Sequence, residues 1–154
     1  MPEPIIETIA AAIATQLATI LEADDYSEDA VVVRPKTFSG YDPEHGQIAL
    51  IQEDRVPTEG GAENRANWTQ SFAIVFYVRP SEDDAAAGDT LANQRAADIE
   101  RALAYADRSD WWVDGMVDYR LIGPSPMPDE TESGGGFYTL EVDYRHNDGD
   151  PYTA

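Results

Sequence analysis

The most apolar stretch of the chain runs from Trp68 to Val78 and is followed closely by Pro80. Aromatic and β-branched residues dominate it, which predicts a long strand that ends before the proline. Its side chains alternate between two faces, one almost wholly apolar and one that changes from polar to apolar along the strand. In the second half of the strand, the apolar side chains of both faces therefore need to be shielded from solvent. Because we expect only two helices of useful length, which would cover one face, a neighbouring subunit is the simplest cover for the other.

Two segments repeat apolar residues at intervals of three and four, the period of an amphipathic helix. The first runs from Pro2 to Leu21 and carries a narrow stripe of isoleucine and leucine. The second begins near Asp89 or Thr90, either of which suits the N-cap position. Both stripes predict helices that lie on a sheet. The expected stripe of the second helix is rich in alanine and comprises Leu91, Arg95, Ala96, Ile99, Ala102, Leu103 and Ala106.

Four other segments predict strands, because each is rich in β-branched or aromatic residues or alternates in polarity. They are residues 31–33, 47–53, 113–122 and 137–146. Together with the helices they predict a single α+β domain over residues 1–154, with an antiparallel sheet of about four to five strands and two helices packed mainly on one face. The polar, glycine- and proline-containing stretches 54–67 and 123–136 predict flexible loops, and residues 147–154 predict a flexible tail.

Aromatic residues outside the expected core stripes are candidates for a subunit or partner interface. Trp111 and Trp112 are adjacent, so in a strand they would point to opposite faces. One would enter the core, and the other would face a partner or solvent. The candidate interface residues are Trp68, Tyr77, Trp111, Trp112, Phe137 and Tyr152.

The chain is strongly acidic: thirty acidic residues against ten basic ones give a formal charge of −20, and Lys36 is the only lysine. Such a charge repels nucleic-acid phosphates and anionic membranes, so binding through phosphate contacts is not expected. The acidic excess need not serve a specific function, because a need for solubility or adaptation to high salt would each account for it.

Other bounds come from what the sequence lacks. It has no cysteine, which excludes disulfides and thiolate metal sites. No apolar run reaches the roughly 20 residues needed to span a bilayer. The first helix begins without a basic leader, which argues against a signal peptide. We therefore expect a soluble protein without an export signal.

Few residues suggest catalysis or metal binding. The only histidines, His45 and His146, have carboxylates nearby and could form a metal site or an acid–base pair. In a chain this acidic, however, such neighbours are expected by chance. The segment Asn147–Asp150 resembles a fragment of a calcium loop but is too short and lacks the closing glutamate. We therefore expect no enzyme activity, no cofactor and no metal.

The order of elements is similar to that of a known family. After a leading helix and short strands, the segments that carry the likeness are Tyr77-Val78-Arg79-Pro80, a helix over 96–103, a strand around Gly115-Met116-Val117-Asp118, and a last strand over 136–145. This layout resembles the tail-terminator, or tail-completion, proteins of long-tailed phages and related viruses. The likeness covers nearly the whole chain and rests on order and pattern, without a diagnostic motif.

The resemblance implies a structural virion protein without catalytic residues. Members of the family form hexameric rings that cap the tail tube, end its polymerisation and provide the surface for the head-side connector. The implied partners are other copies of the chain, the tail-tube protein and the connector, with DNA passing through the lumen without specific binding. The implied location is the head-proximal end of the tail, after assembly in the host cytoplasm. The acidic excess is not a family feature; a salt-loving host is one explanation for it, and an acidic lumen that repels DNA is another.

Two other functions fit the same sequence. One is another head–tail connector or a tail-tube component, which differs because a tube protein polymerises as stacked rings while a terminator stops at one. The other is a small acidic cellular binding module, or a hydrolase that uses His45 or His146. This second class predicts a monomer or dimer with a well-formed pocket.

Overall fold

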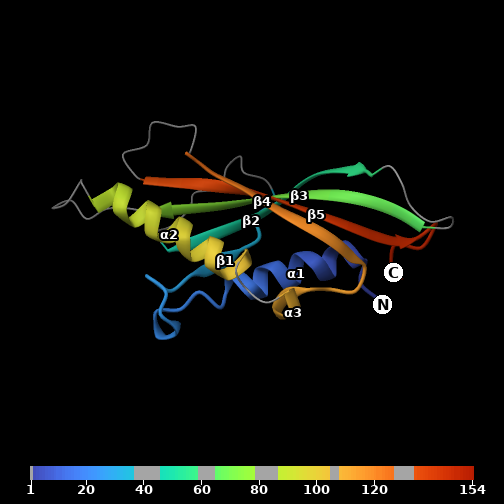
Figure 1. The fold of residues 1–154 in the computed structure, drawn as a ribbon, viewed down its shortest axis with the longest axis horizontal. Helices are drawn as coiled ribbons and strands as arrows, with labels where there is room; N and C mark the ends of the chain where they lie inside the picture. The colour runs from blue at the N-terminus through green and yellow to red at the C-terminus, as the bar shows by residue number, and fades with distance from the viewer. Residues whose placement is uncertain (1, 37–45, 59–64, 79–86, 105–107, 127–133) are drawn as a thin grey trace.

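The computed structural model describes residues 2–36, 46–58, 65–78, 87–104, 108–126 and 134–154, and Figure 1 shows their arrangement. His45 and Ala106 lie outside these ranges. Apart from a single 3-10 turn at Glu22–Asp24, the elements in chain order are α1 (Ile5–Leu17), β1 (Val31–Val33), β2 (Gln47–Pro57), β3 (Arg65–Val78), α2 (Ala87–Leu103), α3 (Arg108–Trp111), β4 (Met116–Pro126) and β5 (Gly134–Asn147).

The strands form one five-stranded sheet in the order β1-β2-β3-β5-β4. β3, the strand predicted from the aromatic stretch, lies at its centre and pairs with β5 without a break from Arg65 opposite Asn147 to Val78 opposite Gly134. The α+β prediction is confirmed. One detail differs: β1 runs parallel to β2, so the sheet is mixed. A parallel pair needs a connection of about a dozen residues or more, and the number of residues between β1 and β2 meets this requirement.

Both long helices lie on the same face of the sheet, as predicted (Figure 1). Ile9, Ile13 and Leu17 of α1 are fully buried there, and α2 contributes its alanine-rich stripe. They pack with side chains of the central strands, including Phe72 and Leu140. α1 is shorter than the predicted 2–21, because the turn after Leu17 already leaves the helix.

The opposite face of β3 carries a second, smaller cluster. Ala49, Ile51, Ala73 and Val75 are buried there, with Phe137 packed against them. Both faces of the second half of β3 are thus covered, as its pattern predicts. These side chains are already buried in the single chain, so the expectation that a neighbouring subunit must cover them loses its basis.

The strands extend into both stretches predicted as flexible loops. β2 continues to Pro57, which is opposite Trp68 of β3, and β4 continues to Pro126, which is opposite Gly136 of β5. The predicted boundaries were wrong because backbone pairing, which needs no apolar side chains, carries these polar segments. Residues 59–64 and 127–133 lie outside the described part of the chain.

The tail after β5 is ordered against α1, contrary to the prediction. The chain turns at Gly149, whose φ of 77° lies in the left-handed region, and Asn147 N donates to Thr153 O at 2.8 Å. Ile5 N then donates to Pro151 O at 3.0 Å, which satisfies a donor at the first turn of α1. The calcium-like segment therefore serves as a turn that docks the tail on the helix.

Candidate functional site

The adjacent tryptophans do not occupy a strand. Trp111 ends the short helix α3 and is buried in the main core, where its ring meets that of Tyr119 edge-on, with the ring centroids 4.8 Å apart. Trp112 follows, is half-buried and packs against the same core. The strand premise of the prediction is wrong, because Trp111 ends a helix and Trp112 lies just after it. Trp111 is the core member, and Trp112 stays partly exposed at the edge of the same core.

Trp68 belongs to a polar cluster at the far end of the long strands. Its indole Nε1 donates to His146 Nε2 at 3.0 Å, and Nδ1 of the same imidazole lies 2.8 Å from Asn147 O. The guanidinium of Arg55 lies 4.4 Å above the Trp68 ring and donates to Tyr144 OH at 3.3 Å.

These contacts indicate which tautomer of the His146 imidazole fits the site. Because Trp68 donates to Nε2, the proton of a neutral imidazole resides on Nδ1 and points at the carbonyl of Asn147. Both ring nitrogens of this buried residue are therefore engaged. A metal or proton-transfer role for His146 would require giving up these bonds. Among the described residues, no group of three or more histidine or acidic side chains is placed to hold a metal ion.

The remaining candidate aromatic residues lie in two further places. Phe137 is half-buried against the second cluster, and Tyr77, opposite Gly135, shares that face. Tyr152 is exposed beside the start of α1, near Glu3. The six predicted interface residues thus occupy separate regions and form no single patch.

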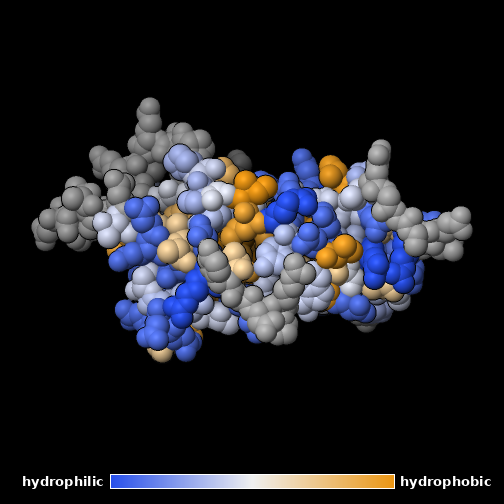
Figure 2. All heavy atoms as spheres, in the orientation of Figure 1, coloured by the Kyte–Doolittle hydropathy of each residue, from blue (hydrophilic) through white to orange (hydrophobic). Residues whose placement is uncertain are grey.

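Exposed apolar side chains instead mark the two edges of the sheet. Val31 on β1 is 59% exposed, and on β4 the exposed fractions are 49% for Val117 and 51% for Ile122. On the face shown in Figure 2, apolar side chains form small groups among hydrophilic ones. Sequence reasoning missed these residues. A usable signal was the pair Leu121 and Ile122, since only one of two adjacent residues in a strand can face the helices.

Charged side chains border Ile122 on β4. Arg120 donates to Glu141 Oε2 at 3.0 Å and to Asp143 Oδ2 at 3.2 Å, across to β5. The hydrogen bond with Glu141 raises the pKa of Arg120, and the charge of Asp143 adds to this effect. Thr69 of β3 also donates to Asp143, at 2.6 Å. The β4 edge therefore combines an exposed apolar side chain with an ionic group of one arginine and two carboxylates, which keeps one negative charge.

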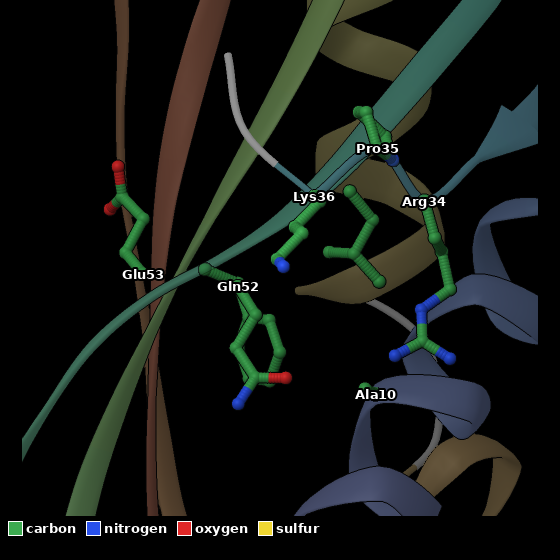
Figure 3. A pocket seen from close by; sticks show the side chains of 8 residues that line it. Ala10, Arg34, Pro35, Lys36, Gln52 and Glu53 are labelled. Carbon is green, nitrogen blue, oxygen red and sulfur yellow. The ribbon is translucent and has the colours of Figure 1, made fainter. Parts of the chain in front are cut away.

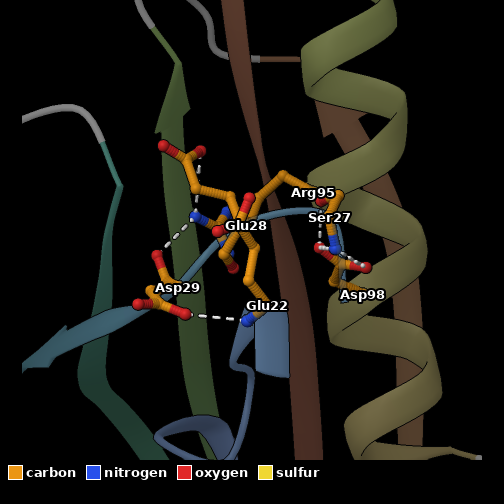
Figure 4. A network of polar contacts seen from close by, with 6 residues as sticks. All are labelled: Glu22, Ser27, Glu28, Asp29, Arg95 and Asp98. Carbon is orange, nitrogen blue, oxygen red and sulfur yellow. Dashed lines mark hydrogen bonds and ion pairs between the residues drawn. The ribbon is translucent and has the colours of Figure 1, made fainter. Parts of the chain in front are cut away.

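The β1 edge is held in place by a buried arginine (Figure 4). Arg95 of α2 is only 2% exposed and donates to Glu28 O at 3.0 Å and to Asp29 O at 3.1 Å. Its Nη2 also lies 3.4 Å from the Glu28 carboxylate. Burial lowers the pKa of Arg95, and nearby carboxylates, Glu28 first, oppose that shift.

A second group of bonds fastens the same connector. Asp98 of α2 accepts from the Ser27 backbone N at 3.2 Å and from the Ser27 hydroxyl. Asp29 Oδ1 accepts from Glu22 N at 2.7 Å. The connector between α1 and β1, residues 22–30, is therefore tied to α2 along its length, and this fixes the position of the edge strand.

No helix in the described ranges is long and apolar enough to cross a membrane.

The chain has also been compared with known proteins. Comparison of the chain with models of protein families and with curated proteins finds no match.

Proposed function

We propose that the chain is a structural protein of a viral tail that closes into a ring at the head-proximal end of the tail tube, as the tail-terminator proteins it resembles do. The observation that carries this proposal is the pair of apolar sheet edges. A cyclic assembly joined head to tail needs two different surfaces on each subunit. β1 with Val31 and β4 with Val117 and Ile122 supply two such surfaces at opposite ends of one sheet.

The charge of the chain fits a ring that DNA must cross. Each copy carries −20, and carboxylates around a lumen repel phosphate, so DNA passes without specific binding. The same charge opposes assembly at low salt. Screening shortens the reach of this repulsion, because the Debye length falls from about 10 Å at 0.1 M to about 3 Å at 1 M ionic strength.

The two open sides of such a ring would meet different partners. In this proposal one side binds the last ring of the tail-tube protein and stops its growth, and the other binds the head-side connector. Ring formation takes place in the host cytoplasm, and the finished protein belongs to the virion. A salt-loving host would account for the acidic excess.

Light scattering after size exclusion tests the proposal across low and high salt. We expect a closed species near the six subunits implied by the resemblance, favoured by salt. V31D and I122D should each leave a folded protomer that no longer closes. L21D is the matched control, because Leu21 is 38% exposed and lies before β1, outside the sheet.

Three outcomes would overturn the proposal. A monomer at every salt concentration would show that this chain does not close into a ring by itself. An open-ended polymer would favour a tail-tube component. Assembly that survives both edge variants places the interface elsewhere. Circular dichroism of each variant shows whether a lost ring reflects a lost fold.

A further inference from the structure

A hollow of about 340 Å³ lies between α1 and β2, beside the residues that follow β1 (Figure 3). Its base is apolar, formed by Ala10, Leu50 and Phe72, all of which belong to the main core. Its volume is at the lower end of the roughly 300–1,000 Å³ typical of small-molecule pockets. A group of a few carbon atoms fits such a space.

The rim gathers two of the ten basic side chains of the chain, Arg34 and Lys36. Arg34 is bound to Glu7 of α1 through two bonds of 2.6 and 3.1 Å, so its charge is matched. Lys36 has no hydrogen bond or ion pair with any residue in the described ranges. Figure 3 shows its ammonium group directed into the hollow, while the carboxylate of Glu53 points away. As far as the described residues go, the hollow thus presents one positive charge without a bound carboxylate.

We infer that this hollow binds a carboxylate group carried on a short apolar stem. Lys36 would pair with the carboxylate in a charge-assisted hydrogen bond, the amide of Gln52 lies on the same rim, and the apolar base would hold the stem. Lys36, the one lining cation without a partner among the described residues, matches the single charge of a carboxylate. A phosphate dianion would meet only one unmatched cation within a chain of −20 and is disfavoured.

The same chemistry has two sources. One is a free small carboxylic acid, and the other is the carboxylate side chain of another copy of this acidic chain. The inference does not depend on ring formation, because a soluble carboxylate can test the hollow in any oligomeric state.

Titration with hexanoate, followed by NMR chemical shifts in 1 M NaCl, is the first test, with hexanamide as the uncharged analogue. Lys36→Gln should weaken hexanoate binding about two- to fivefold, because Lys36 is exposed and its ion pair is partly screened by salt. Arg145→Gln is the matched control, because Arg145 is an exposed cation on β5 outside the hollow. Its affinity should equal that of the wild type.

Two results would overturn the inference: equal binding by the Lys36→Gln and wild-type proteins, or hexanamide binding as tightly as hexanoate. Absence of saturation at about 50 mM hexanoate would also overturn it. Light scattering in the presence of hexanoate then separates the sources. Smaller assemblies with hexanoate and with Lys36→Gln identify a carboxylate from a neighbouring copy. Unchanged mass with hexanoate bound identifies a free small carboxylate.

Discussion

Replacement of Arg95 by methionine tests how the β1 edge is held. Methionine fills a similar volume, has similar helix propensity and lacks the guanidinium. The substitution removes the donors to the carbonyls of Glu28 and Asp29, which lie 3.0 and 3.1 Å away. A hydrogen bond from a charged donor contributes about 1.5–3 kcal/mol. Arg95 is the buried partner of these bonds, since Glu28 is half-buried and Asp29 is exposed.

Two effects reduce this cost. The Glu28 carboxylate is 39% exposed, so water can replace the lost contact at 3.4 Å. Removing the arginine also removes its own desolvation, the main cause of its lowered pKa. We therefore expect R95M to reduce the free energy of unfolding by about 2–4 kcal/mol, a large part of the roughly 5–15 kcal/mol typical of a domain.

Arg101 provides a matched control on the same helix. It donates to Asp25 O at 2.8 Å and lies 4.5 Å above the ring of Tyr26, so it contacts the same connector. Unlike Arg95 it is exposed. Water can replace its contacts, and R101M should cost less than about 1 kcal/mol.

Urea unfolding is the appropriate assay, because urea is uncharged and does not screen the acidic surface. With a slope of about 1–3 kcal/mol per molar urea, R95M should lower the midpoint by about 1–2 M. If R95M loses no more stability than R101M, the reasoning fails. Apolar packing would then replace the buried cation without loss, as happens for some buried ion pairs.

Two further substitutions test local contacts. The hydrogen bond from Arg34 lowers the pKa of Glu7 below its ordinary 4.5, so this contact stabilises the fold above that pH and is lost as the pH falls through the lower folded-state value. Both side chains are more than a third exposed, so the pair contributes less than about 1 kcal/mol to the free energy of unfolding. E7Q should therefore make the unfolding temperature fall less steeply as the pH is lowered, and an unchanged slope would contradict this. G136A should cost about 1–3 kcal/mol in urea unfolding, because a Cβ there would lie 2.8 Å from Ser125 O and 2.9 Å from the Phe76 ring; wild-type stability would refute the described β4–β5 pairing.

The sequence predicted what depends on local periodicity. β3 was identified by its aromatic and β-branched content, and Arg95 was placed in the buried stripe of the second helix by its spacing alone. What could not be predicted depends on distant partners. The carbonyls that accept from Arg95 lie some 66 positions earlier in the chain, and no local pattern announces them.

The candidate interface shows the same division. Trp111 is a core residue because a short helix directs it towards Tyr119, a contact that requires β4 to be in place. The tail after Asn147 reads as polar and free, yet it docks because the first turn of α1 leaves donors such as Ile5 N to be satisfied. Aromatic character alone could not separate core residues from surface residues.

The Arg95 contacts connect stability to the proposed assembly. Glu28 and Asp29 accept from Arg95, Ala30 N donates to Ile20 O at 2.9 Å, and Val31 N donates to Gly46 O at 3.1 Å, so the edge strand follows directly from the fastened connector. The same strand leads into the rim of the hollow. A variant that frees the connector should therefore impair ring closure and hexanoate binding together, at temperatures well below global unfolding. V31D should impair ring closure alone. If R95M instead keeps both properties up to its unfolding temperature, β1 is positioned by its pairing with β2 and not by the buried arginine.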